Sequence, residues 1–432
     1  MNCWPPNFAI TIIEPTMLKT DRLLSLPTAL PAEVGLCDQR SAGLLAVLQS
    51  EIERKRLPGA VVLIARHGKV ALFESLGVQD PASGQAMAKD SIFRIYSMTK
   101  PIVSVAVMML MEQGRVMLSD PVGKYLPEFA DQQVAVPADA DHPPTLRPAT
   151  RPATVQDLLR HTAGLTYEFM GDLPVHSQYA QARIGSRQRS NAEFSTALAA
   201  LPLLADPGSM WEYSRATDVL GRLVEVLSGQ SLGEFLQEKI LGPLGMHETA
   251  FSVPAAQHGR IAEPYAHDPD GGVPMPMIDI RSEAALASGG GGLAATAMDY
   301  ARFLQFMLNR GELDGVRLLG PHTVDFMTAD HLGDIPVNPA GAAPGLLPPG
   351  HGFGLGFAVR TAAGLAAVPG SVGLYYWGGI AGTTFFVDPA QDMFALMMIQ
   401  APNQREYFRP LFRNLVYAAL LDEPNPAKVQ AP

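Results

Sequence analysis

Ser97 and Lys100 are the residues of this chain whose types and spacing are best suited to chemistry. The apolar residues that follow, 98–111, predict a long buried helix that opens at this point. Side chains three residues apart share one face of a helix, so the hydroxyl and the amine would face each other. An alcohol beside an amine that can take its proton is the pairing that a serine nucleophile needs. Pro101 fits the first helical turn, where its missing N–H has no intrahelical partner.

Two further segments carry candidate groups. Tyr213 lies between a loop and an expected helix, where its phenolate can act as a base if cations lower its pKa. The alternative is a half-buried packing tyrosine. Gly378 and Gly379 stand inside a strand pattern, which marks a close backbone approach to a ligand or to another chain segment. A free N–H there can form half of an oxyanion hole, and a plain bulge or turn is the alternative.

Other motifs predict structural roles or are missing. The glycine-rich run 288–293 lacks the lysine of a P-loop, so we expect a structural or cleft-lining loop. His161 ends a short expected helix that begins with a capping box at 154–157, and we expect it to be structural. The ten histidines form no ligand cluster, so neither a metal nor a cofactor is expected. The G-x-S-x-G signature of α/β-hydrolases is absent.

Composition restricts the classes of function. The chain has 432 residues, of which 47% are hydrophobic and 17% charged, and this is typical of a globular protein with a large core. A net charge of -10 without a long basic run argues against nucleic-acid binding. Two cysteines, Cys3 and Cys37, are too few for a disulfide scaffold and favour a reduced, cytoplasmic setting. We expect neither a signal peptide nor a membrane helix, and either Met1 or Met17 can be the start.

The elements that must position these residues follow from hydrophobic periodicity. Both ends of the chain predict strands and the middle predicts helices, so the two ends should meet in one sheet. We expect helices at 38–56 and 408–421, a hairpin of strands 60–65 and 70–74, an extended loop at 137–152, and an antiparallel meander of strands 374–377, 383–387 and 393–399. The predicted parts are an irregular extension (1–35), a first α/β segment (36–110), a mostly helical domain (111–285) and a second α/β segment (286–432).

Five phrases in this order resemble the serine β-lactamase and penicillin-binding-protein superfamily. They are residues 93–100, 158–165, 207–208 with 213–214, 288–293, and 377–379. The resemblance spans about 36–421 and is greatest to the class C β-lactamase-like esterases called family VIII carboxylesterases. It implies an α+β fold in which an antiparallel sheet, built from N- and C-terminal segments and flanked by helices, carries a mostly α-helical inserted domain.

The resemblance also implies roles for individual residues. Ser97 would be the acylated nucleophile, and Lys100 would help to deprotonate it and keep Tyr213 poised. Tyr213 would act as general base in acylation and in activating the deacylating water. The backbone N–H groups of Ser97 and Ile380 would form the oxyanion hole, since Ile380 follows the position of the family's third-motif glycine, Gly379.

Two departures from the family pattern bear on the substrate. The second motif commonly reads Tyr-x-Asn, whereas residues 213–215 read Tyr-Ser-Arg. The third reads Lys-Thr-Gly in true β-lactamases, whereas residues 377–379 read Trp-Gly-Gly. A tryptophan offers an apolar wall instead of a cation, which should weaken anionic β-lactams by about 1 kcal/mol or more. The substrate-binding positions implied are Trp377, Gly378, Gly379 and Arg215.

The sequence therefore predicts a serine esterase that hydrolyses short-chain carboxylic esters through an acyl-enzyme on Ser97. A β-lactamase or D-amino-acid peptidase on the same fold is the alternative, and so is an acyltransferase. A non-catalytic binding protein is disfavoured by the intact Ser97, Lys100 and Tyr213. The expected partner is a small-molecule ester, without nucleic acid or membrane. The sequence does not indicate the natural substrate, the enantiopreference or the oligomeric state.

Overall fold

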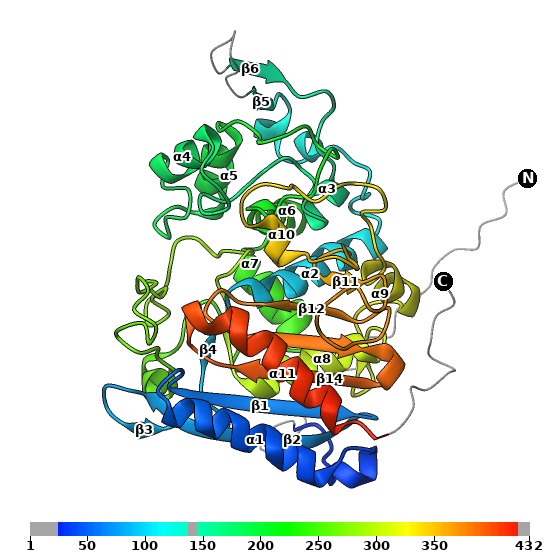
Figure 1. The fold of residues 1–432 in the computed structure, drawn as a ribbon. Helices are drawn as coiled ribbons and strands as arrows, with labels where there is room; N and C mark the ends of the chain where they lie inside the picture. Colours follow the sequence, from blue (N-terminus) through cyan, green and yellow to red (C-terminus); the bar gives the residue numbers. More distant parts are fainter. Residues whose placement is uncertain (1–24, 137–144, 422–432) are drawn as a thin grey trace, which may run out of the picture.

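The largest sheet of the described residues is eight-stranded and antiparallel, in a computed structural model that describes residues 25–136 and 145–421 (Figure 1). The strand order is β10-β11-β12-β13-β14-β1-β2-β3. The strands are β1 Gly59–Arg66, β2 Lys69–Asp80, β3 Gln85–Ala86, β10 His351–Phe353, β11 Ala358–Arg360, β12 Tyr375–Gly378, β13 Thr384–Asp388 and β14 Met393–Met398. Because β1 pairs with β14, the two ends of the chain meet in one sheet, as predicted. Cys3 and both candidate start residues lie outside the described residues.

Strand β1 contributes side chains to two hydrophobic clusters, one on each face of the sheet. All eight of its residues are buried, and successive side chains point to opposite faces of the sheet. Val61 and Leu63 join the larger cluster, whereas Val62 and Ile64 join a second cluster on the other face. The hairpin of β1 with β2 and the meander of β12, β13 and β14 confirm the predicted strands.

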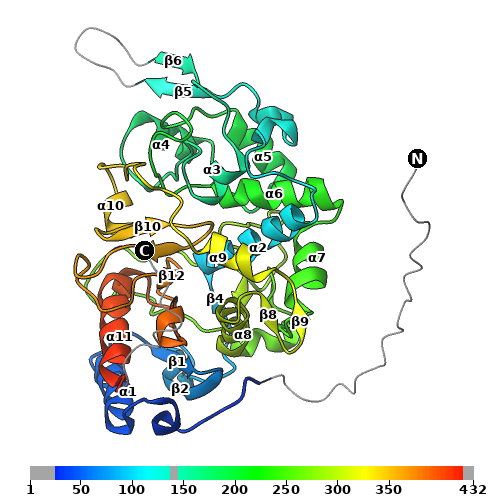
Figure 2. The same cartoon turned by 90° about the vertical axis from the view of Figure 1, so that its right-hand side faces the viewer.

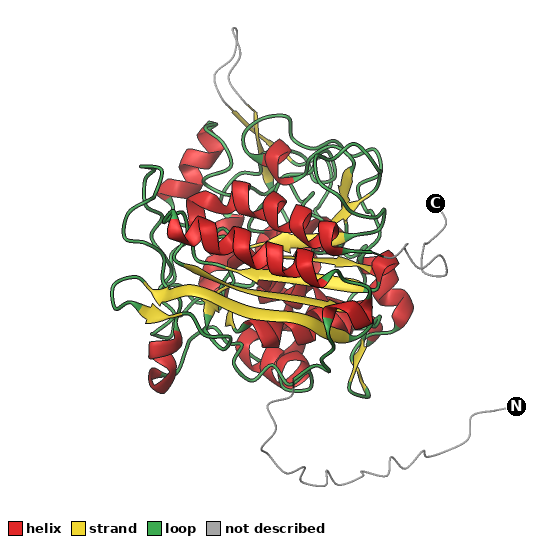
Figure 3. Ribbon diagram, turned by 60° about the horizontal axis from the view of Figure 1, so that its bottom comes forward, coloured by secondary structure: helices red, strands yellow, loops and turns green. Residues whose placement is uncertain are grey.

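Helices cover both faces of this sheet (Figure 3). On one face α1 (Asp38–Glu53) and α11 (Arg405–Ala419) contribute Leu44, Leu48 and Phe412 to the second cluster. On the other face lie α8 (Ala297–Leu308) and α2 (Thr99–Glu112). The remaining helices are α3 Val155–Leu159, α4 Pro174–Gln181, α5 Asn191–Ala199, α6 Ala216–Ser228, α7 Leu232–Leu236, α9 Pro321–Met327 and α10 Ala343–Leu346. None of the described helices combines the length and apolarity needed to span a bilayer.

Helix α2 matches the predicted helix that follows Ser97. Every residue of α2 from Thr99 to Leu110 is buried, as expected of a helix that is apolar on all sides. It packs against α6 and is preceded by one 3₁₀ turn, Tyr96–Met98. The long buried helix gives the nucleophile candidate a rigid base.

Within the described ranges, three short strand pairs lie outside the main sheet, namely β4 Phe93–Arg94 with β7 Ala294–Ala295, β5 Gln133–Val136 with β6 Thr145–Pro148, and β8 Glu312–Leu313 with β9 Val316–Arg317. The expectation of a loop over 137–152 is wrong for residues 145–148, which form β6 and pair with β5. This pair lies at the top of Figure 2. Leu203 fixes β5 through two backbone hydrogen bonds of 2.7 and 2.9 Å, which leaves the other edge of β5 to pair with β6. Proline concealed the strand because Pro148 stands at its end, where it is tolerated. Residues 137–144 lie outside the described residues, and the four-part division of the chain stays a prediction.

Candidate active site

Ser97 sits in the 3₁₀ turn between β4 and α2, and neighbouring segments hold this turn in place. The Ile95 N–H donates to Leu293 O at 3.1 Å, and the Leu293 N–H donates to Thr99 Oγ1 at 3.1 Å. Tyr96 has φ 44°, in the left-handed region that a bulky residue rarely adopts. Such strain persists only where the surroundings determine the backbone, and it is typical of functional turns.

Lys100 is fully buried and has three hydrogen-bond partners. Its Nζ lies 3.2 Å from Ser97 Oγ, 3.0 Å from the Tyr167 hydroxyl and 2.7 Å from Gly290 O. No carboxylate of the described residues forms an ion pair with it. Burial is the largest influence and lowers the pKa of Lys100 to about 7, although the nearby Asp218 acts in the opposite direction. A large share of this amine is therefore neutral near pH 7, as a proton acceptor must be.

Asp218 and Gly290 place the carbonyl that Lys100 contacts. Asp218 Oδ1 accepts hydrogen bonds from the Gly290 N–H at 2.9 Å and from Ser288 Oγ at 2.5 Å. A Cβ at position 290 would lie 2.6 Å from Asp218 Oδ2, so only glycine fits here without a shift of Asp218. This geometry gives the glycine-rich run a structural role beside the site.

Tyr213 lies close to both Ser97 and Lys100. Its hydroxyl accepts a hydrogen bond from Trp377 Nε1 at 3.1 Å, and Lys100 Nζ is 4.5 Å from the centre of its ring. Burial raises the pKa of Tyr213 well above that of a free phenol, whereas hydrogen bonds with Ser97 and Trp377 and the charge of Arg409 lower it in part. The resting phenol is therefore protonated.

Trp377 has a polar role in addition to the expected apolar one. Trp377 is only 5% exposed, and its ring centroid lies 5.1 Å from that of Tyr213 and 5.3 Å from that of Phe353. The expectation of an apolar wall overlooked the indole N–H, which points at the Tyr213 oxygen. The residue that replaces the family's third-motif lysine thus still presents a donor.

The turn after Trp377 lies against the segment that leads to Ser97. A Cβ on Gly379 would lie 2.5 Å from Ile95 O, so the two backbones touch there. The turn is closed by hydrogen bonds from Gly379 N–H to Thr383 O and from Gly382 N–H to Gly379 O, each 2.9 Å, and the Ile380 N–H takes part in neither. This arrangement is compatible with the predicted oxyanion hole of Ser97 and Ile380, which stays a prediction.

Arg215 is held inside the protein. Its guanidinium pairs with Glu168 at 2.6 Å and Asp218 at 3.8 Å and lies 4.7 Å from the centre of the Tyr167 ring. With 12% of its side chain exposed, it orders the surroundings of Tyr167. A direct substrate contact by Arg215 stays a prediction.

Three contributors to the site were missed in the sequence. Tyr167, the second oxygen partner of Lys100, stands two residues after the phrase 158–165, so that phrase was its available signal. Asp218 had only its position in the first turn of α6 as a signal. Arg409, which donates to Gly379 O at 2.5 Å, comes from α11 and had none.

His161 supports the loop that carries Tyr213. Its backbone has φ 59°, its Nδ1 accepts from the Ser214 N–H at 3.3 Å, and its ring lies 4.8 Å from that of Tyr213. Burial and the nearby Lys100 lower the pKa of His161 well below its usual value, so the ring is neutral. These contacts give His161 the structural role that the sequence indicated.

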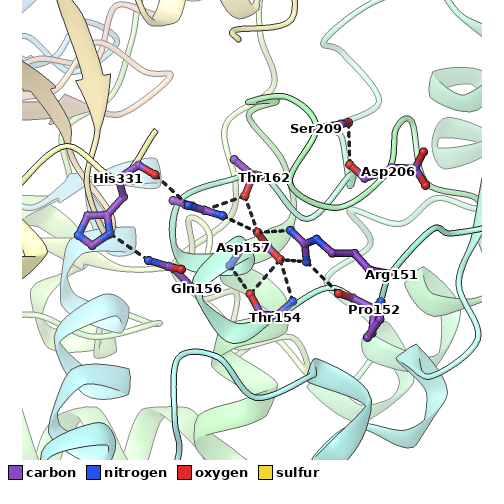
Figure 4. A network of polar contacts seen from close by, with 10 residues as sticks. Arg151, Pro152, Thr154, Gln156, Asp157, Thr162, Asp206, Ser209 and His331 are labelled. Carbon is purple, nitrogen blue, oxygen red and sulfur yellow. Dashed lines mark hydrogen bonds and ion pairs between the residues drawn. The ribbon is translucent and has the colours of Figure 1, made fainter. Parts of the chain in front are cut away.

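A buried polar network anchors the chain just before His161 (Figure 4). The predicted capping box is present, with Thr154 N–H 2.9 Å from Asp157 Oδ2 and Asp157 N–H 3.2 Å from Thr154 Oγ1. Asp157 also accepts hydrogen bonds from Arg151, Arg160 and Thr162. Burial alone would raise its pKa, but these donors hold it at about 2. Asp157 is therefore a fully paired structural anion.

Comparison with known proteins identifies the family. The family model described as Beta-lactamase matches residues 44–419. Esterase EstB of Burkholderia gladioli is 33% identical over 382 residues, which are 83% of this chain and 90% of that protein. Protein Rv1367c of Mycobacterium tuberculosis is 35% identical over 351 residues, covering 80% and 86%.

A solved structure supports the same family assignment. EstCE1, described as a hydrolase with promiscuous acyltransferase activity, superposes with a TM-score of 0.71 at 28% identity, covering 88% of this chain and 99% of that one. The chain belongs to the Beta-lactamase family and has its fold, an antiparallel sheet flanked by helices. The resemblance to esterase-like members of this family, stated from the motifs, is confirmed.

Proposed function

We propose that this protein is a serine hydrolase that cleaves carboxylic esters, short-chain esters among them, through an acyl-enzyme on Ser97. The observation that carries the proposal is the contact of Ser97 with a buried lysine whose pKa is lowered to about 7. A surface lysine would be charged at neutral pH and could not take the serine proton. The relationship to an esterase supports the same reaction class.

In the acylation step, Ser97 Oγ attacks the ester carbonyl and its proton passes to the neutral amine of Lys100. The oxyanion that forms is held by the N–H groups of Ser97 and Ile380. The resemblance implied that Tyr213 is the general base of acylation, but burial raises its pKa and keeps it protonated, so we assign it the role of general acid in this step. Tyr213, hydrogen bonded to Ser97, gives its proton to the departing alkoxide. The products are the free alcohol and acyl-Ser97, and the site then holds a lysine cation and a tyrosine anion.

The deacylation step restores both groups. The Tyr213 phenolate takes a proton from water, which attacks the acyl carbonyl, and Ser97 leaves with the proton returned by Lys100. The net reaction is ester plus water giving acid plus alcohol. The Trp377 N–H stabilises the phenolate between the two steps, because a hydrogen bond to a charged acceptor is about twice as strong as a neutral one.

Position 377 favours esters over β-lactams. The buried indole offers no cation for a substrate carboxylate, and its N–H is already used by Tyr213. A neutral ester needs no such cation. Acyl transfer is the second candidate reaction, with an alcohol in place of water, and the structural neighbour described as a hydrolase with promiscuous acyltransferase activity favours it.

The test measures hydrolysis of p-nitrophenyl butyrate and of a chromogenic cephalosporin by the wild type and by Ser97→Ala. We expect ester turnover to exceed cephalosporin opening, and the mutant to lose at least about 10³-fold of kcat with an unchanged thermal unfolding midpoint. A fluorophosphonate should label the wild type at Ser97 by mass spectrometry. Ester turnover that survives in Ser97→Ala, or preferential cephalosporin opening, would reject the proposal.

A further inference from the structure

A row of aromatic rings runs from the buried site to the protein surface. The ring centroids are 5.1 Å apart for Trp377 and Tyr213, 5.4 Å for Tyr213 and Tyr167, and 4.8 Å for Tyr167 and Phe169. Trp377, Tyr213 and Tyr167 are each 5% exposed, whereas Phe169 is 54% exposed. The last ring therefore has an open apolar surface at the end of a row that begins beside the nucleophile.

The segment that carries Phe169 is fixed. Met170 is 2% exposed, and its carbonyl accepts a hydrogen bond of 2.9 Å from the Ala342 N–H. The Phe169 ring stacks on Tyr167 with an interplanar angle of 20°, and Glu168 between them pairs with Arg215 at 2.6 Å. An exposed aromatic ring held this way is preorganised, so little conformational entropy is lost when a ligand covers it.

Three contacts connect Ser97 with Phe169. Lys100 Nζ is 3.2 Å from Ser97 Oγ and 3.0 Å from the Tyr167 hydroxyl, and the Tyr167 ring stacks on Phe169. We expect a butyryl group on Ser97 to be too short to reach Phe169 and a longer alkyl or aryl acyl group to reach it. The acyl group stays attached to Ser97 until deacylation.

We propose that Phe169 and Tyr167 form an acyl-binding wall, so that esters of medium-chain or aryl carboxylic acids are bound better than short-chain ones. This inference rests on the proposed function, since it places the acyl group on Ser97. The contact is apolar and selects for length and apolarity, because burial of each added methylene against a ring is favourable. Phe169 determines specificity and takes no part in bond making.

The experiment compares p-nitrophenyl butyrate and octanoate with wild type, Phe169→Ala, Phe169→Trp and Phe326→Ala. Phe326 is the matched control, because it is also an exposed phenylalanine (43%), but it packs against His331. We expect Phe169→Ala to raise KM about tenfold for octanoate and less than twofold for butyrate, with kcat retained. Phe169→Trp should keep the preference, and Phe326→Ala should change neither KM.

Two results would overturn the wall. One is an equal change in KM for both acyl lengths, and the other is an effect that follows the alcohol chain, seen by comparing octyl acetate with ethyl acetate. If the wild type shows no Ser97-dependent ester turnover, the proposed function fails and the wall is judged by binding. Calorimetric titration then measures the affinity of Ser97→Ala for methyl octanoate. Adding Phe169→Ala should weaken this affinity about tenfold, and an unchanged affinity would reject the acyl-binding wall.

Discussion

Asp157 and Lys100 are both buried ionisable groups, yet their surroundings differ in kind. Asp157 is contacted by two arginines, two hydroxyl groups and a backbone N–H, and its pKa is held at about 2. Lys100 has two hydroxyl groups and one carbonyl as partners, and burial lowers its pKa to about 7. A fully paired charge stabilises a structure, whereas an incompletely compensated charge is ready to exchange a proton.

The largest effect is expected from a substitution of Lys100. Lys100→Arg keeps the cation but cannot be deprotonated at neutral pH, so kcat/KM for p-nitrophenyl butyrate should fall about 10³-fold. In the wild type, kcat/KM should rise with pH around a midpoint near 7, because the neutral amine forms as pH increases. Steady-state kinetics from pH 5 to 9 measure both effects.

A matched substitution tests whether this loss is specific. Lys124→Arg changes an exposed lysine that pairs with Asp120 at 2.9 Å, and it should leave kcat/KM and its pH profile unchanged. A wild-type rate that is flat between pH 5 and 9, or a Lys100→Arg enzyme of normal activity, would contradict the assignment of Lys100 as proton acceptor.

Asp157 should show the opposite pattern, with loss of stability and retained chemistry. Its pKa falls from 3.8 to about 2 on folding, and at about 1.36 kcal/mol per pKa unit the ionised form contributes about 2 kcal/mol. Because the folded pKa is depressed, this contribution is present above pH 4 and is lost as pH falls through about 2. Asp157→Asn should therefore lower the free energy of unfolding by about 2 kcal/mol at pH 7.

Urea titrations at pH 7 and pH 3 measure the effect, and the difference from wild type should shrink at the lower pH. Glu238→Gln, at an exposed pair with Lys239, is the control and should change stability by less than about 0.5 kcal/mol. An equal loss at both pH values would show that the Asp157 charge is not what stabilises the loop.

The two regions also differ in what the sequence could predict. Thr154 and Asp157 of the capping box are three residues apart, and so are Ser97 and Lys100. Local geometry therefore determines both contacts. The hairpin and meander strands were predictable because β1 and β14 are short apolar runs bounded by turn residues, as expected of strands buried on both faces. Motif resemblance, rather than spacing, added Tyr213 and Trp377.

The rest depends on tertiary packing. The Trp377 to Tyr213 hydrogen bond joins residues 164 positions apart, and Arg409 reaches Gly379 from the last helix. Nothing in either segment alone specifies which edge of the indole faces the phenol. Strand β6 was missed for a similar reason, because β5 is fixed by Leu203, which is distant in sequence.

The smallest effect is expected from a substitution of Trp377. Trp377→Phe keeps an aromatic ring but removes the N–H that contacts Tyr213, so kcat/KM for p-nitrophenyl butyrate should fall about tenfold. Trp211→Phe is a close control. Trp211 is 0% exposed and lies 6.3 Å from the Tyr213 ring, but its Nε1 has no hydrogen-bond partner among the described residues.

Both substitutions remove the same atoms from rings packed on the same tyrosine. If the hydrogen bond matters, Trp377→Phe alone should slow the reaction, since Trp211→Phe deletes a donor that contacts no acceptor. If packing around Tyr213 matters instead, the two variants should lose activity to a similar extent. Because the phenolate forms as the alkoxide departs, the Trp377→Phe defect should fall on acylation, the step that kcat/KM reports, so pre-steady-state release of p-nitrophenol should show a slower and smaller burst than in wild type.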